Sequence, residues 1–169
     1  MVIIIDALYF NTSLTSLRLC HVWIGSDGAA LLANALNVNT TLQKLFLWNN
    51  KMGDAGTIQL AGMLHENFSL KELEIRDNEI GSEGAAALAN ALFENNFLKY
   101  LLLPNNNIKD EGAIFLATAL ESNKTLAVLA IENNNVGLVG LDAFTKVLQA
   151  NFTLQHFYFV FFYVSNIYY

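Results

Sequence analysis

The residues best suited to acid/base chemistry are two carboxylates in one short stretch. Glu72 and Glu74 lie two positions apart, so in an extended strand their side chains would share one face, about 7 Å from each other. Such a pair can exchange protons with a substrate inside a dry pocket, but nothing in the surrounding sequence encloses it. Because Arg76 follows on the same face, a salt-bridged surface patch is the simpler interpretation.

The cysteine and the histidines offer little further chemistry. Cys20 is the single cysteine, and only the adjacent His21 could activate it as a nucleophile; a small packing residue is the commoner role. His21, His65 and His156 occupy unrelated positions, so they cannot converge on one metal ion, and no cluster has zinc-ligand spacing. We therefore expect no catalytic residue, no metal site and no cofactor, and we do not expect an enzyme.

Composition narrows the class of protein. The 169 residues are 54% apolar and 14% charged, with a net charge of −6. This is enough apolar surface for a folded core, and the acidic balance argues against a nucleic-acid partner. A single cysteine excludes an internal disulfide framework and suits a reducing compartment. Because the first residues, MVIIIDALYF, make a poor signal peptide, we expect a cytoplasmic location.

The elements that must position these residues come from a 28-residue repeat. Leucine follows each repeating asparagine after three residues, and the asparagines are Asn11, Asn39, Asn67, Asn95, Asn123 and Asn151. A fixed period of this size indicates a solenoid. We expect one domain over 1–169, with a partial repeat 1–10, full repeats 11–38, 39–66, 67–94, 95–122 and 123–150, and an incomplete repeat with an apolar tail, 151–169.

Each repeat contains a strand pattern, a turn and a helix pattern. Leucines alternate as in Leu45-Phe46-Leu47, which predicts a short strand with one buried face. A ladder of asparagines, whose amides can satisfy backbone groups in the turn, follows at Asn50, Asn78, Asn106 and Asn134. The expected helix N-caps are Ser26, Asp54, Ser82 and Asp110. Glycines two residues later indicate close helix packing, at Gly28, Gly56, Gly84, Gly112 and Gly140.

The repeat N-x-[TS]-L-x-x-L-x-L-x-x-N-x-[IM]-G-x-x-G-A-x-x-L-A-x-A-L resembles the leucine-rich repeat of ribonuclease-inhibitor type over residues 11–150. It is especially similar to the sensor regions of NOD-like receptors. The resemblance implies an α/β fold, a right-handed leucine-rich-repeat solenoid or horseshoe with a parallel concave sheet and convex helices. Family members bind proteins or sense ligands, mostly through the concave face. Ran GTPase-activating proteins share the repeat type, so the repeat alone does not determine the function.

Several positions depart from this pattern. Val22 and Phe162 stand where the asparagine ladder would continue, Leu138 replaces the cap of the fifth helix, and Lys109 replaces a loop glycine. The sequence contains no G-x-x-x-x-G-K-[ST] phosphate-binding motif. Without polar caps at its ends, the chain resembles a fragment of a larger repeat protein.

The strongest candidates for function are side chains that should project from the concave face. They are Arg18, Lys44, Phe46, Trp48, Glu72, Glu74, Arg76, Tyr100, Leu102 and Glu132. Exposed aromatic residues and arginine with polar neighbours are typical of protein interfaces, so we expect another protein as the partner. The alternative is that adjacent side chains merely cover one another.

The end of the chain and five glycosylation sequons each allow two interpretations. The aromatic segment 155–169 predicts either a membrane attachment or, more simply, a sixth strand with Phe157 and Phe159 inward, since it is too short and interrupted for a span. The sequons at Asn11, Asn39, Asn67, Asn123 and Asn151 fall at one repeat position. We interpret these asparagines as structural rather than as extracellular modification sites.

Three hypotheses for function remain. The first is a non-catalytic protein-interaction module that resembles the ligand-sensing repeats of NOD-like receptors. The second is a GTPase activator or an enzyme inhibitor that uses the same face. The third is a membrane-attached repeat protein held by the aromatic tail.

Overall fold

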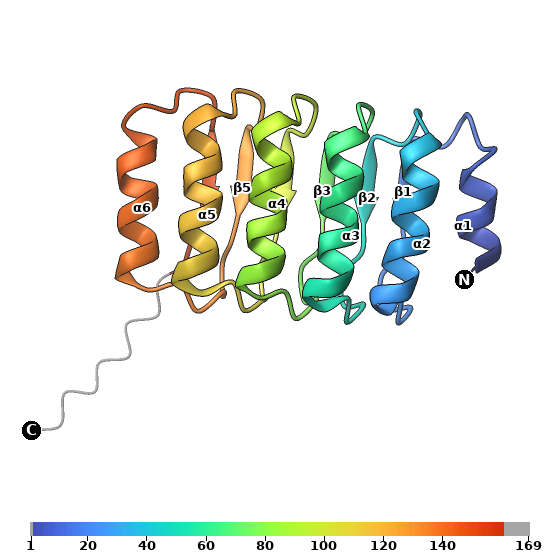
Figure 1. Ribbon diagram of the computed structural model, residues 1–169, viewed down its shortest axis with the longest axis horizontal. Coiled ribbons are helices and arrows are strands. Elements are labelled where there is room, and N and C mark those ends of the chain that lie inside the picture. The colour runs from blue at the N-terminus through green and yellow to red at the C-terminus, as the bar shows by residue number, and fades with distance from the viewer. Residues whose placement is uncertain (1, 161–169) are drawn as a thin grey trace, which may run out of the picture.

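Helices and strands alternate along the whole described chain. In the computed structural model, which describes residues 2–160, the helices are α1 (Val2–Leu8), α2 (Gly25–Val38), α3 (Gly53–Glu66), α4 (Ser82–Glu94), α5 (Lys109–Ser122) and α6 (Leu138–Leu148). The strands are β1 (Ser16–Arg18), β2 (Lys44–Phe46), β3 (Glu72–Glu74), β4 (Tyr100–Leu102), β5 (Val128–Ala130) and β6 (His156–Tyr158). Figure 1 shows the helices side by side in one layer, with the strands behind them.

The strands form one parallel sheet in chain order, β1 to β6. Each residue pairs with the residue 28 positions later, as Leu45 does with Leu73 and Leu101 with Leu129. The repeat in the sequence is therefore the register of the sheet, as predicted. Strand β6 also confirms the expected sixth strand, with Phe157 half-buried against the Phe144 ring at 4.5 Å between centroids. Residues 161–169, which include Phe162, lie outside the described residues.

The core lies between the sheet and the helices. Its strand side is made by the central leucines Leu45, Leu73, Leu101 and Leu129, all fully buried. Its helix side is made by alanine and leucine at spacings of three and four, because these positions share one face of a helix. In α4, for example, Ala85, Leu88, Ala91 and Leu92 are buried. None of the helices within residues 2–160 is long and apolar enough to cross a membrane.

The asparagine ladder connects consecutive repeats after each strand. Asn78 is fully buried, and its amide nitrogen donates to the carbonyl of Leu47 in the preceding repeat at 2.8 Å. Its side-chain oxygen accepts from the backbone N–H of Asn50 at 3.0 Å. Asn106 does the same for Asn78, at 2.9 Å. The ladder therefore satisfies backbone groups that the turn leaves without partners.

The prediction that Ser26, Asp54, Ser82 and Asp110 cap their own helices is wrong. No side chain caps its own helix at the starts of α2 to α6. Instead, the Asp54 carboxylate accepts hydrogen bonds from the backbone N–H groups of Gly81 and Gly84, at 2.6 and 2.9 Å, at the start of the next helix, α4. Asp110 binds Gly137 and Gly140 at the start of α6 in the same way. Although Leu138 stands at the expected cap position of α6, Asp110 of the preceding repeat caps this helix.

Four of the five predicted helix glycines, Gly56, Gly84, Gly112 and Gly140, mark close contacts between neighbouring helices. A Cβ atom on Gly112 would lie 2.9 Å from the Ala85 Cβ and 3.2 Å from the Ser82 Cα of α4. Gly56 and Gly140 face the preceding helix just as closely, through Ala29 and Ala113. Larger side chains there would push the repeats apart, as the sequence predicts.

Candidate protein-binding surface

The side chains on the strands that point away from the helices form a grid of three rows, here called the concave grid. The first row contains Ser16, Lys44, Glu72, Tyr100, Val128 and His156, and the second contains Arg18, Phe46, Glu74, Leu102, Ala130 and Tyr158. The third row follows the strand ends, with Cys20, Trp48, Arg76, Pro104 and Glu132. All ten predicted concave residues therefore lie on this grid.

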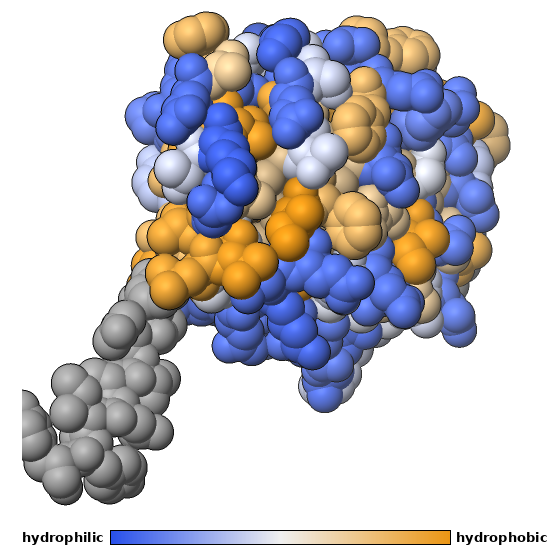
Figure 2. Space-filling view, turned by 60° about the vertical axis from the view of Figure 1, so that its left-hand side comes forward, coloured by the Kyte–Doolittle hydropathy of each residue, from blue (hydrophilic) through white to orange (hydrophobic). Residues whose placement is uncertain are grey.

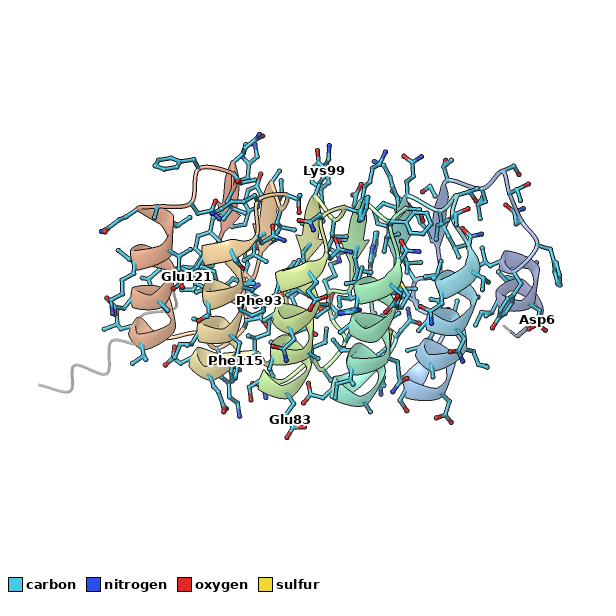
Figure 3. The ribbon with its side chains drawn as sticks, turned by 45° about the horizontal axis from the view of Figure 1, so that its top comes forward. Asp6, Glu83, Phe93, Lys99, Phe115 and Glu121 are labelled. Carbon is cyan, nitrogen blue, oxygen red and sulfur yellow. The ribbon has the colours of Figure 1, made fainter. Side chains whose placement is uncertain are left out.

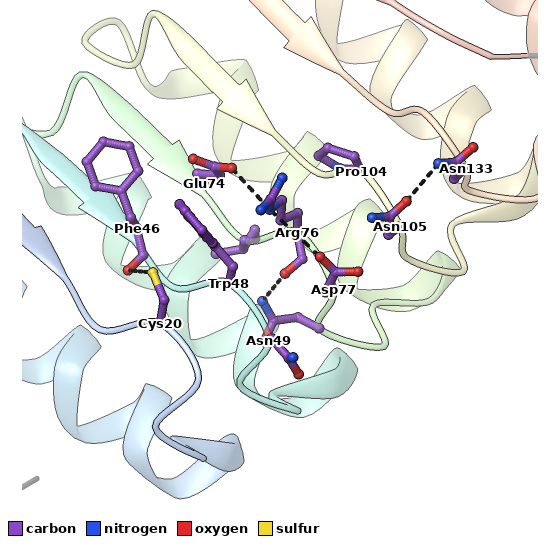
Figure 4. Close-up of polar contacts among 12 residues, drawn as sticks. Cys20, Phe46, Trp48, Asn49, Glu74, Arg76, Asp77, Pro104, Asn105 and Asn133 are labelled. Atoms are coloured by element: carbon purple, nitrogen blue, oxygen red, sulfur yellow. Dashed lines mark hydrogen bonds and ion pairs between the residues drawn. The ribbon is translucent and has the colours of Figure 1, made fainter.

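Two arginine side chains cover two aromatic rings on the grid. The Arg18 guanidinium carbon lies 4.5 Å from the centre of the Phe46 ring. The Arg76 guanidinium carbon lies 4.2 Å from the centre of the Trp48 ring, and Figure 4 shows the Arg76 side chain beside Trp48, with ion pairs to Glu74 and Asp77. These contacts combine cation–π attraction with shielding of the apolar rings.

The expected exposure of Phe46 is wrong. Only 6% of this residue is exposed, because the Arg18 stack covers its ring. Trp48 is half-buried, whereas 41% of Tyr100 is accessible. Part of the alternative interpretation therefore holds at the β1–β3 end of the grid, where side chains cover one another. The variants that test binding must avoid Phe46, since removing its ring would leave a cavity.

The paired carboxylates occur in ion pairs. Glu72 accepts a hydrogen bond from Lys44, with 2.9 Å between Oε2 and Nζ, and this contact raises the pKa of Lys44. Arg76 Nε lies 3.5 Å from Glu74 Oε1 and 3.7 Å from Asp77 Oδ2. Burial raises the pKa of Glu74, and the positive charge of Arg76 opposes this shift. Glu72 and Glu74 thus form the salt-bridged patch that the sequence suggests.

Three buried polar atoms in the third row have no hydrogen-bond partner within the described residues. They are Trp48 Nε1, Arg76 Nε and Glu132 Oε2; for Arg76 Nε the nearest acceptor is the 3.5 Å ion-pair contact with Glu74. Buried polar groups without hydrogen bonds are uncommon in native proteins. All three atoms belong to one repeat position and are covered by neighbouring side chains, and both Trp48 and Arg76 oppose the rise in the pKa of Glu74.

The other sequence candidates do not gather into a site. Cys20 is a free thiol whose sulfur lies 3.6 Å from the Phe46 carbonyl oxygen (Figure 4). His65 binds the carboxylates of Glu66 and Glu94 on the helix side, far along the chain from His21 and His156. Among the described residues, no three His, Cys, Asp or Glu side chains are grouped to hold a metal ion.

Comparison with known proteins identifies the repeat and the fold. The family model of the leucine-rich repeat matches residues 10–33, 66–89 and 94–117. The chain is similar in structure to leiomodin-1 actin-binding site 2, with a TM-score of 0.71 and 21% identity over 87% of this chain and 86% of that chain. It is also similar to the Caenorhabditis elegans tropomodulin C-terminal domain, with a TM-score of 0.72 and 16% identity over 88% of this chain and 90% of that one. The fold is a leucine-rich-repeat solenoid.

At these identities the neighbours show the fold of the chain and not its function. The expected right-handed leucine-rich-repeat solenoid, with a parallel sheet on one face and helices on the other, is confirmed. No curated protein sequence gives a significant match to the chain. The closer resemblance to ribonuclease-inhibitor repeats and NOD-like receptors remains a prediction.

The leucine-rich-repeat domain also explains the sequons. Asn67 is 5% exposed, and its amide nitrogen, the atom to which a glycan would be attached, donates to the Leu36 carbonyl at 2.8 Å. Its side-chain oxygen accepts from the backbone N–H groups of Ser69 and Leu70. Equivalent buried asparagines form a second ladder before each strand, at Asn39, Asn95, Asn123 and Asn151. This agrees with the structural interpretation.

Sequence reasoning missed a second period of two repeats on the helix side. Helices α2 and α4 share the pattern S-[DE]-G-A-A-x-L-A-N-A-L, whereas α3 and α5 carry Asp54 and Asp110 at the first position and Ile58 and Ile114 further on. The two aspartates cap the following helix, and the two isoleucines line surface grooves. Comparing residues 56 positions apart in the sequence would have revealed both the pair of aspartates and the pair of isoleucines.

Proposed function

We propose that the leucine-rich-repeat domain is a non-catalytic protein-interaction module that binds another protein through its concave grid. The observation that carries this proposal is the group of Trp48, Arg76 and Tyr100 on the grid, where the Arg76 guanidinium stacks on the Trp48 ring and 41% of Tyr100 is exposed. The Arg76 side chain is itself 39% exposed, so the guanidinium can donate hydrogen bonds to acceptors of a partner. Arginine and aromatic residues in the centre of such a patch are frequent interface anchors.

The pairing of the carboxylates supports a binding role over catalysis. Glu72 is held by Lys44 and Glu74 by Arg76, so neither carboxylate is free as an acid/base group. Tyr100, which is exposed beside them in the next strand, adds an accessible aromatic contact. Tyrosine is frequent in protein interfaces because its ring packs against apolar groups of the partner while its hydroxyl makes a hydrogen bond.

The neighbouring structures suggest a first partner to test. Leiomodin-1, to whose actin-binding site 2 the chain is similar, makes actin a candidate partner of this domain. The repeat pattern supports a second and wider proposal, that the domain belongs to a ribonuclease-inhibitor-type or NOD-like-receptor-like protein of the cytoplasm. A GTPase activator or an enzyme inhibitor would use the same grid, so a change in turnover of the captured partner distinguishes these roles from simple binding. The membrane alternative concerns residues 157–169, of which 161–169 lie outside the described residues.

The test is capture of partners by the full chain, with purified actin in parallel with a cytosolic lysate. We expect Arg76→Ala and Tyr100→Ala to lose the captured protein at least about tenfold, which corresponds to about 1.4 kcal/mol. Lys51→Ala and Lys124→Ala, on exposed loops off the grid, are the matched controls and should bind as the natural chain does. Equal capture by all four variants, each confirmed as folded by circular dichroism, would exclude the concave grid as the binding surface.

A further inference from the structure

The charges of the domain are divided between its two faces. The helices carry ten of the fifteen acidic residues but only two of the nine basic ones, Lys109 and Lys146. Most lysines and arginines therefore lie on the strands and loops. The helix face is therefore acidic, and it favours a partner whose binding surface is positively charged.

Apolar side chains also remain exposed on this acidic face. Ile58 on α3 is 42% exposed and Phe93 on α4 is 45% exposed. Figure 2 shows both apolar and hydrophilic side chains on one face of the molecule, and Figure 3 labels Phe93, Phe115, Glu83 and Glu121 on the helix layer. A mixed surface of this kind suits an amphipathic partner better than a purely charged one.

A groove between α3 and α4 combines these features. It has a volume of about 630 Å³, is open to solvent, and is lined by Ile58, Ala61, Gly62, Ala87, Phe93 and Glu94, among others. We call it the α3/α4 groove. Ile58 and Phe93 provide apolar side chains beside small alanine and glycine positions. A Cβ atom on Gly62 would meet nothing within 4 Å, so there is room for a side chain from outside.

Two carboxylates stand at the end of the α3/α4 groove. His65 Nδ1 lies 3.1 Å from Glu66 Oε1, and His65 Nε2 lies 3.0 Å from Glu94 Oε2. The Glu66 and Glu94 side chains are still 71% and 69% exposed, so their remaining oxygens can accept hydrogen bonds from a cation. One imidazole cannot neutralise two carboxylates, and the end of the groove therefore stays acidic.

We propose that the α3/α4 groove binds an amphipathic helix of a partner protein, with leucine-type side chains against Ile58, Gly62 and Phe93 and lysine or arginine against Glu66 and Glu94. A helix fits because its side-chain ridges can lie in the groove between two parallel helices. The groove is too open to enclose a small molecule, which needs a concave pocket around most of its surface. This site is separate from the concave grid, and the proposal does not rest on the proposed function.

The two-repeat period provides a natural comparison. The groove between α5 and α6, about 280 Å³, is lined by Ile114, the counterpart of Ile58, and by Val139, whose counterpart does not line the α3/α4 groove. There Thr118 replaces Gly62, and Lys146 adds a positive charge on α6, next to Asp142. A basic helix should therefore prefer the α3/α4 groove.

The experiment uses the full chain and two labelled probe peptides. The first is a helical leucine/lysine peptide of about 18 residues, about 27 Å long, and the second has glutamate in place of every lysine. Fluorescence anisotropy should show saturable binding of the lysine peptide and at least about tenfold weaker binding of the glutamate peptide. Failure of the lysine peptide to bind, or equal binding of the two peptides, would overturn the proposal.

Two kinds of variant locate the binding. Gly62→Leu fills the groove, and since leucine is a better helix former than glycine it should not unfold α3; we expect binding to weaken about tenfold. Asn34→Leu, at the equivalent exposed position on α2, is its control and should leave binding unchanged. The double variant Glu66→Gln/Glu94→Gln should weaken binding and reduce its salt dependence. Normal binding by both Gly62→Leu and the double variant would exclude this groove, and Arg76→Ala should have no effect.

Discussion

Among the single residues, Asp54 and Asp110 have the most consequential contacts. Each carboxylate belongs to one repeat and binds two backbone N–H groups at the start of the helix in the next. These N–H groups have no partner within their own helix, and the negative charge also interacts favourably with the positive end of the helix dipole. Each aspartate is thus both a helix cap and a connection between repeats.

Asp54→Ala removes one of these connections. We expect the free energy of unfolding to fall by about 1–2 kcal/mol, the usual loss for a helix cap, as measured by urea denaturation. Ser82→Ala is the matched control, because Ser82 occupies the same repeat position and its hydroxyl makes no hydrogen bond within the described residues. A loss no larger for Asp54→Ala than for Ser82→Ala would show that the carboxylate contributes nothing to stability.

At the level of elements, the helix starts differ although the repeats look alike. Helices α2, α3 and α5 begin with a residue at positive φ, namely Gly25, Gly53 and Lys109, and the N–H of each donates to the backbone of the next repeat. Helices α4 and α6 instead follow extended glycines, Gly81 and Gly137, which donate to the capping aspartates. The presence of aspartate in the preceding repeat thus accompanies the change of backbone conformation.

Lys109 is the one of these three first residues that carries a side chain at positive φ. Its φ of +59° lies in the left-handed region, which disfavours residues with a Cβ. Lys109→Gly should therefore raise the free energy of unfolding by up to about 1 kcal/mol, measured by urea denaturation. The reciprocal variant Gly53→Lys, at φ +57° with no atom within 4 Å of the added Cβ, should lower it by a similar amount. A loss of stability for Lys109→Gly, or a gain for Gly53→Lys, would contradict backbone strain as the cause.

These contrasts explain what the sequence could and could not predict. The strands, helices and first asparagine ladder followed directly from the period, because each position has one environment in every repeat. The caps were assigned to the wrong helix, since Asp54 has the sequence of a local cap but its carboxylate accepts hydrogen bonds from the start of α4. The burial of Phe46 depends on where the Arg18 side chain lies, and periodicity alone does not give that contact.

On the scale of the whole molecule, the domain is a stack with nearest-neighbour contacts. Within residues 2–160, each helix backbone contacts only the helices before and after it, and each strand only its adjacent strands. The stability of such a stack is approximately a sum over repeats and the junctions between them. Weakening one junction should therefore affect the two sides of the stack unequally.

Asn78→Ala tests this at the junction between the repeats of α3 and α4. It removes one accepted and two donated hydrogen bonds, to Asn50, Leu47 and Arg76, and leaves buried backbone groups unpaired. We expect a loss of about 2–3 kcal/mol, with amide hydrogen exchange accelerated more in α2 and α3, on the shorter side, than in α5. Asn90→Ala, an exposed asparagine of α4, should change neither quantity. Uniform acceleration throughout the chain would mean instead that the repeats unfold as one cooperative unit, so that breaking any junction weakens all of them together.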